Sequence, residues 1–210
     1  MTPRRRVAGY YFVTDAALSR AGNESDVRSA ERAGVALVQY RAKEGSTRAL
    51  FREAEALRSI CRASLFIVND RLDLALAVGA DGVHLGQDDL PCRVARRLLG
   101  PERIVGVSVL TAEEARVAER DGADYVGVSP VFDTRTKPDA GTAGGLEAVR
   151  AVRRAVAIPV VAIGGIDLGN AAEVLRAGAD GVCAISAVVR ASDVEAEIRK
   201  FQKLFPASAA

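Results

Sequence analysis

A short repeat is the feature of this sequence that most constrains its fold. Three copies read Gly79-Ala-Asp-Gly-Val, Gly122-Ala-Asp-Tyr-Val and Gly178-Ala-Asp-Gly-Val, and Gly34-Val-Ala-Leu-Val is a degenerate copy. Each copy follows a helix-like segment, and glycine commonly ends a helix because it can adopt the left-handed conformation. The apolar residues after each glycine are typical of a buried parallel strand.

The spacing of the repeats predicts how many strands the chain forms. The four glycines are 45, 43 and 56 residues apart, so each interval has room for a strand, a helix, a second strand and a second helix. The additional strands are expected at residues 10–15, 65–70, 104–108 and 159–165. Eight strands that alternate with helices predict a single-domain α/β protein, a (β/α)₈ TIM barrel. An open doubly wound sheet is the alternative.

The chain length favours one domain with short loops. Its 210 residues are near the lower limit for a barrel of this kind. We therefore expect a catalytic barrel over residues 9–205, with tails at residues 1–8 and 206–210.

Charge and composition limit the classes of partner. There are 29 basic and 27 acidic side chains, a balance that argues against a nucleic-acid surface. The basic run at residues 4–6 is not followed by the apolar stretch of a signal peptide, so we expect none, and no apolar run is long enough to cross a membrane. Its three cysteines lack metal-site spacing and indicate reduced thiols in a cytoplasmic protein. The expected partners are small molecules, and a homo-oligomer is left open.

Three polar residues share one face of the expected strand at residues 37–43. Gln39, Arg41 and Lys43 are two residues apart, so a strand directs their side chains to the same side. A solvent-facing edge could explain them, but a closed barrel has no edge. Since the carboxyl ends of barrel strands carry function, the pattern favours an anion site.

Carboxylates follow the next two strands. Asn69-Asp70 alone is typical of a helix N-cap, and either residue of Asp88-Asp89 could cap the helix after it. However, Asp70 and Asp89 would lie on the same rim as Arg41 and Lys43. Two carboxylates beside two cations suit a Mg²⁺ ion that bridges a diphosphate.

The sequence predicts a structural role for His84 and argues against a nucleophilic role for Ser108. His84 is the only histidine, and no carboxylate or cysteine lies at ligand spacing from it, so we expect a hydrogen-bonded core residue. Ser108 ends a strand without an evident partner base, which argues against a serine nucleophile. Thr111 and Glu114 form a predicted capping box.

The longest repeat interval contains an extended loop at residues 130–145. Thr134, Arg135, Thr136 and Lys137 supply two hydroxyls and two cations, a set suited to phosphate. A loop of this length in a minimal barrel predicts a substrate lid or clamp, and a merely disordered loop is the alternative.

The last two strands are expected to end at a phosphate site. Gly164-Gly165 and Ile185-Ser186 follow them, and the corresponding loops of this fold commonly bind phosphate through backbone N–H groups.

Taken together, these motifs resemble the thiamine-phosphate synthase family. The matching strings run in order within residues 9–205: Gln39-Tyr-Arg-Ala-Lys43, Val68-Asn-Asp70, Gly82-Val-His-Leu-Gly-Gln-Asp-Asp89, Gly106-Val-Ser108, Thr134-Arg-Thr-Lys137, Ile163-Gly-Gly165 and Ile185-Ser186. The resemblance implies a Mg²⁺-dependent transferase. Such an enzyme joins hydroxymethylpyrimidine diphosphate to a thiazole phosphate and releases pyrophosphate.

The resemblance also implies residue roles. Asp70 and Asp89 would bind Mg²⁺. The implied catalytic residues are Arg41, Lys43, Ser108 and Lys137. The implied contacts of the pyrimidine diphosphate are Gln39, Arg41, Lys43, Asn69 and Lys137. Ser108 would lie near the pyrimidine, and Tyr40 is implied to bind substrate. The implied contacts of the thiazole phosphate are Thr134, Thr136, Gly165, Ile185 and Ser186. One departure is Val109-Leu110-Thr111, since many members carry His-Thr where Leu110-Thr111 stands here.

Two other functions fit the same barrel. A thiazole tautomerase-like isomerase would keep the phosphate site, but it would not need the cations and carboxylates that suit a diphosphate. A non-catalytic regulatory protein would bind thiazole phosphate and release no pyrophosphate.

Overall fold

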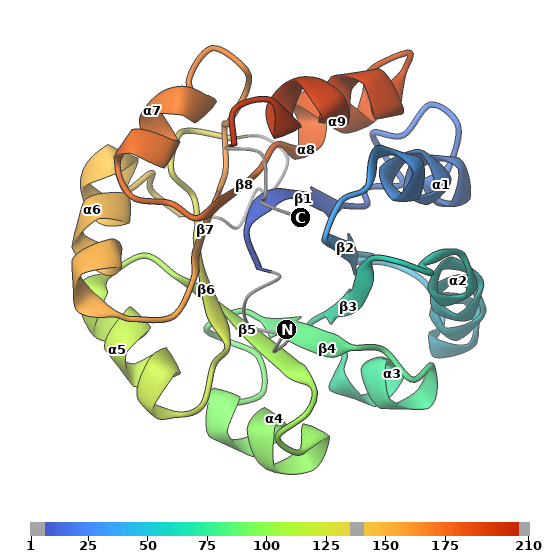
Figure 1. Cartoon of the computed structure of the whole chain (residues 1–210). Helices are drawn as coiled ribbons and strands as arrows, with labels where there is room; N and C mark the ends of the chain where they lie inside the picture. The colour runs from blue at the N-terminus through green and yellow to red at the C-terminus, as the bar shows by residue number, and fades with distance from the viewer. Residues whose placement is uncertain (1–6, 135–140, 206–210) are drawn as a thin grey trace.

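Eight parallel strands close into a barrel in the computed structural model, which describes residues 7–134 and 141–205. Each strand pairs with its sequence neighbours, and β1 pairs with β8 (Figure 1). The predicted (β/α)₈ barrel is therefore confirmed. The strands are β1 (Gly9–Val13), β2 (Leu37–Tyr40), β3 (Leu65–Asn69), β4 (Gly82–Leu85), β5 (Ile104–Val109), β6 (Tyr125–Val128), β7 (Val160–Ile163) and β8 (Gly181–Cys183).

Helices surround the barrel on its outside (Figure 1). They are α1 (Asn23–Ala33), α2 (Thr47–Ile60), α3 (Leu72–Ala77), α4 (Cys92–Leu99), α5 (Ala112–Arg120), α6 (Gly145–Ala155), α7 (Ala171–Arg176), α8 (Ile185–Val189) and α9 (Val194–Gln202). The last strand is followed by two helices, where the sequence suggested one. The predicted capping box at Thr111 and Glu114 is present at the start of α5. Within the described ranges, every helix is too short or too polar to cross a membrane.

The repeated glycines end helices as predicted. Gly34, Gly79, Gly122 and Gly178 all have positive φ angles, between 63° and 111°. A residue with a side chain is strained in this conformation, which explains why glycine recurs at these turns.

The aspartates of the three complete repeats hold the start of a neighbouring strand. Each accepts a hydrogen bond from a strand N–H group and pairs with an arginine on an earlier helix. The N–H contacts are Asp81 with Phe66 (2.7 Å), Asp124 with Val105 (2.9 Å) and Asp180 with Val160 (2.8 Å). The arginine partners are Arg58 for Asp81, Arg96 for Asp124 and Arg153 for Asp180.

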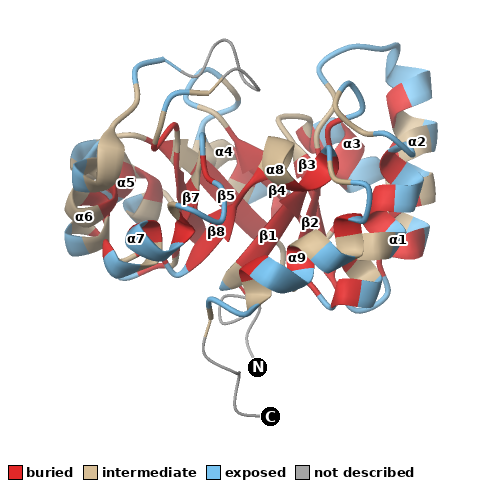
Figure 2. Ribbon diagram, turned by 90° about the horizontal axis from the view of Figure 1, so that it is seen from above, coloured by how far each residue is buried: buried red, intermediate tan, exposed pale blue. Residues whose placement is uncertain are grey.

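Two apolar layers make up the core. The larger one lies between the strands and the helices, and the smaller one fills the barrel interior with side chains such as Tyr11, Ile67 and Tyr125. Figure 2 shows the buried strands at the centre of the molecule. Val7 belongs to the inner layer and is only 1% exposed. Val7 falls within the predicted N-terminal tail, and its apolar side chain is buried inside the barrel.

We predict that the Arg96–Asp124 pair makes a large contribution to stability. Asp124 is 5% exposed, and Arg96 also donates to the carbonyls of Gly100, Arg103 and Gly122. The change Arg96→Met leaves this buried carboxylate without its cation, so the free energy of unfolding should fall by about 3 kcal/mol. Urea unfolding measures the change. The exposed neighbour Arg97 supplies the control, and an equal effect of Arg97→Met would contradict the assignment.

Candidate functional site

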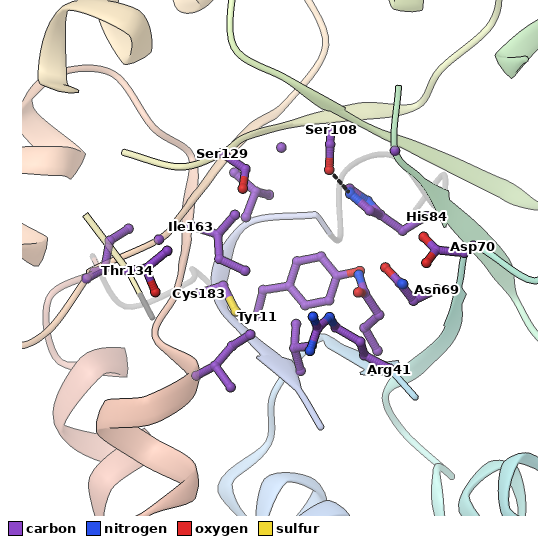
Figure 3. A pocket seen from close by; sticks show the side chains of 18 of the residues that line it. Tyr11, Arg41, Asn69, Asp70, His84, Ser108, Ser129, Thr134, Ile163 and Cys183 are labelled. Carbon is purple, nitrogen blue, oxygen red and sulfur yellow. Dashed lines mark hydrogen bonds between the residues drawn. The ribbon is translucent and has the colours of Figure 1, made fainter. Parts of the chain in front are cut away.

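A cavity opens at the carboxyl ends of the strands, and most of the predicted site residues line it (Figure 3). Those in its lining are Gln39, Arg41, Lys43, Asn69, Asp70, Asp89, Ser108, Thr134, Gly165, Ile185 and Ser186. Arg135, Thr136 and Lys137 lie outside the described residues. The cations and acids expected at one mouth are thus brought together.

Tyr40 is placed differently from the other predicted residues. It is the last residue of β2 and is 2% exposed, within the layer between strands and helices. Its hydroxyl donates to Oε2 of Glu53 on α2 at 2.7 Å. Alternation along β2 turns Gln39 into the barrel and Tyr40 out of it. We therefore leave Tyr40 out of the candidate site.

The two cations are held by acidic side chains. The Arg41 guanidinium lies 3.4 Å from Oδ2 of Asp15, and both side chains are largely buried. Nζ of Lys43 lies 3.1 Å from Oδ2 of Asp70. Although β2 ends before Arg41, both cations continue to face the cavity as the extended-strand argument predicted. These contacts hold both cations at the cavity.

The two carboxylates line the cavity and do not cap helices. Asp70 has a positive φ of 61°, an uncommon conformation outside glycine. No described side chain caps α3 or α4, so neither aspartate has the capping role that the sequence allowed. Oδ2 of Asp89 accepts the N–H of Gly86 at 2.6 Å. Burial raises the pKa of Asp89, and the nearby Asp70 carboxyl raises it further.

The donor set suits a hard cation only if a ligand completes it. Among the described residues, no group of three or more His, Cys, Asp or Glu side chains is placed to hold a metal. Mg²⁺ often takes one or two carboxylates and fills its remaining positions with water and phosphate oxygens. The Asp89 carboxyl, whose pKa the neighbouring Asp70 carboxyl helps to raise, fits that pattern, because a cation would relieve the repulsion.

His84 and Ser108 form a contact that the sequence did not reveal. His84 is buried and hydrogen-bonded as expected, but it also lines the cavity. Its Nε2 lies 2.9 Å from Oγ of Ser108 (Figure 3). Its Nδ1 lies 2.8 Å from the Tyr125 hydroxyl. Ser108 therefore does have an imidazole partner. The two residues are far apart in sequence but stand on the adjacent strands β4 and β5.

Backbone conformation shapes the opposite side of the cavity. Gly164 and Gly165 follow β7 with φ angles of 105° and 62°. A Cβ atom on Gly165 would come within 2.7 Å of the Asp133 carbonyl oxygen. Helix α8 begins nearby at Ile185, and none of the described side chains caps it. Close backbone approach and uncapped N–H groups are typical of phosphate sites in this fold.

Comparison with known proteins gives a consistent result. The family model described as thiamine monophosphate synthase matches residues 10–188. A thiamine-phosphate synthase from Methanosarcina barkeri is 52% identical over 91% of this chain and 88% of its own. One from Chloroflexus aurantiacus is 53% identical over 92% and 91%. The solved thiamine phosphate pyrophosphorylase from Pyrococcus furiosus has a TM-score of 0.87 and 43% identity, covering 96% of both chains.

We predict that Gly165→Ala weakens phosphate binding. The new methyl group would collide with Asp133 and Phe132 and push the loop out of position. Backbone strain of this kind costs about 1–3 kcal/mol, so the affinity for inorganic phosphate should fall by about tenfold. Calorimetry measures this affinity. Gly79→Ala is a matched control because Gly79 has a φ of 63° and open space where its Cβ atom would stand. Equal losses in both variants would refute a local role for Gly165.

Proposed function

Because this chain belongs to the thiamine-phosphate synthase family, we propose that it joins hydroxymethylpyrimidine diphosphate to thiazole phosphate and releases pyrophosphate. The observation that carries the proposal is the shared mouth of Arg41, Lys43, Asp70 and Asp89. The two cations suit the oxygens of a diphosphate, and the two carboxylates suit the metal ion that accompanies it. They would serve no purpose in a tautomerase that handles only a monophosphate.

The leaving group sets the chemistry that the site must perform. As the carbon–oxygen bond to the diphosphate breaks, negative charge grows on the departing oxygens. Arg41 and Lys43 would bind these oxygens and stabilise that charge, and Lys137, outside the described residues, is proposed to do the same. Asp70 and Asp89 would hold Mg²⁺, which when bound would supply further charge neutralisation.

A nucleophilic side chain is not needed for this reaction. The electron-rich aminopyrimidine can support a methylene cation, which the thiazole nitrogen then attacks. Ser108, Gln39 and Asn69 are proposed to orient the pyrimidine half. The barrel holds both halves in line and keeps out water that would otherwise capture the cation.

The thiazole half would bind on the β7–β8 side of the cavity. Gly165, Ile185 and Ser186 are proposed to hold its phosphate largely through backbone N–H groups, with Thr134 from the neighbouring loop and Thr136, outside the described residues. The two charged ends of the substrates would thus lie on opposite sides of the mouth. This separation supports a reaction at the centre, above Tyr11 (Figure 3).

The free cysteines Cys61, Cys92 and Cys183 support a cytoplasmic location.

One assay tests the proposal and separates it from the two alternatives. The purified protein is supplied with both precursors and Mg²⁺, and thiamine phosphate and pyrophosphate are measured. We expect both products in equal amounts. Isomerised thiazole phosphate without pyrophosphate would instead identify a tautomerase. Binding of thiazole phosphate with neither conversion would identify a regulatory protein.

We predict that Asp89→Asn lowers kcat by at least about 100-fold, because metal stabilisation of the leaving group contributes several kcal/mol. The amide oxygen of asparagine can still accept the Gly86 N–H, so the loop should keep its conformation. Asp70→Asn should behave similarly, since asparagine tolerates the positive φ at that position. Pyrophosphate release over a Mg²⁺ titration gives the measurement.

Glu102→Gln is the control for these changes. Glu102 is an exposed carboxylate that does not line the cavity, and the same loss of charge there should leave turnover largely unchanged. If Asp89→Asn retained full activity at limiting Mg²⁺, the metal assignment would be wrong.

A further inference from the structure

A chain of hydrogen bonds crosses the barrel interior below the cavity. Nε2 of Gln39 donates to the Tyr11 hydroxyl at 2.9 Å, and the hydroxyls of Tyr11 and Tyr125 are 2.8 Å apart. The Tyr125 hydroxyl is 2.8 Å from Nδ1 of His84, whose Nε2 is 2.9 Å from Oγ of Ser108. The chain thus joins β2, β1, β6, β4 and β5 and ends at a residue of the active site.

The donors in this chain can be assigned from one end. The amide nitrogen of Gln39 can only donate, so the Tyr11 oxygen accepts. Both phenols are buried, and burial raises their pKa values, which keeps each one protonated with a single O–H to give. Among the residues that the structure describes, the partner for the Tyr11 proton is the Tyr125 oxygen. The Tyr125 proton then goes to Nδ1 of His84.

This order fixes the histidine. A neutral imidazole that accepts at Nδ1 carries its proton on Nε2, and that N–H faces Oγ of Ser108. The Ser108 oxygen therefore accepts, and its own proton is directed to another acceptor. Ser108 lines the cavity, so a bound ligand can supply that acceptor. The reverse order would make Ser108 donate to the imidazole and would withdraw its proton from the cavity.

We propose that His84 is a positioning residue: as its Nε2–H tautomer it turns the Ser108 hydroxyl into a hydrogen-bond donor toward a lone pair on the pyrimidine half of the substrate. The identity of that ligand rests on the proposed function. The tautomer follows from the hydrogen bonds of this chain alone. Tyr11 and Tyr125 act only through His84, whereas Gln39 also lines the cavity.

The tautomer of His84 can be measured directly because the protein has one histidine. Untagged protein labelled with ¹⁵N-histidine gives a long-range ¹H–¹⁵N spectrum of His84 alone. We expect the Nε2–H pattern at neutral pH. An Nδ1–H pattern or an imidazolium would overturn the inference. Wild-type protein that makes no thiamine phosphate would overturn the proposed function, and the tautomer result would still stand.

Tyr125→Phe removes the donor to Nδ1 and tests the chain. We expect a mixture of tautomers and a fall of about tenfold in kcat/KM for the pyrimidine diphosphate, the size expected for one hydrogen bond. The KM for thiazole phosphate should stay unchanged, whereas general damage to the fold would raise this KM as well. Tyr10→Phe is the matched control, because Tyr10 is an equally buried phenol that donates to the Ala184 carbonyl outside the barrel. Equal kinetic losses in both variants would overturn the role of the chain.

Replacement of His84 itself gives a second comparison. His84→Gln keeps an N–H donor at the Nε2 position, whereas His84→Leu has none. We expect the glutamine variant to recover most of the kcat/KM that the leucine variant loses, with thermal unfolding used to confirm that both fold. Equal losses in the two folded variants would contradict a donor role. If the leucine variant does not fold, the wild-type spectrum and Tyr125→Phe decide.

Discussion

Closure of eight parallel strands is the constraint on which every contact in the site depends. In a closed parallel barrel all carboxyl ends meet at one mouth, and alternate residues of each strand point inward. The mouth therefore brings together Gln39, Arg41 and Lys43 with Asp70 and Asp89. In the sequence, α2 and α3 separate these three groups. Pairing of β1 with β8 completes the ring and brings the Gly165 and Ser186 loops to the same opening.

Small residues inside the barrel make room for its polar interior. A Cβ atom on Gly106 would lie 2.2 Å from the Tyr125 ring, and one on Gly127 would lie 3.2 Å from His84. These two strand glycines are required by close approach rather than by backbone conformation, since their φ angles are not positive. The aromatic rings can then pack side by side, with centroids of His84 and Tyr125 5.4 Å apart. Binding and packing thus use the same interior positions.

The sequence predicted the barrel and the charged mouth because both arise from periodic patterns. Repeat spacing gave the strand count, and two-residue alternation gave the shared face of Arg41 and Lys43, even though the strand itself is shorter than expected. The comparisons confirm the family resemblance. Contacts between strands could not be read in this way. His84 meets Ser108 because the register of β4 and β5 pairs His84 with Gly106, and no local pattern encodes that register. The burial of Val7 inside the barrel and of Tyr40 outside it could not be predicted for a related reason, since a chain position alone does not say which apolar layer covers a side chain.

Ion pairs lie at both ends of the barrel, and their burial decides how much each one contributes to stability. At the bottom, Asp124 and Arg96 have side chains only 7% and 19% exposed and share further hydrogen bonds, so separating them would leave a buried charge. At the mouth, Asp70 and Lys43 are 25% and 46% exposed, and pairs of this kind contribute little to stability. Breaking the upper pair therefore costs little. Under the proposed function, Lys43 would exchange its carboxylate for a diphosphate oxygen and Asp70 would be released to face a cation, while the lower pairs keep the strands in register.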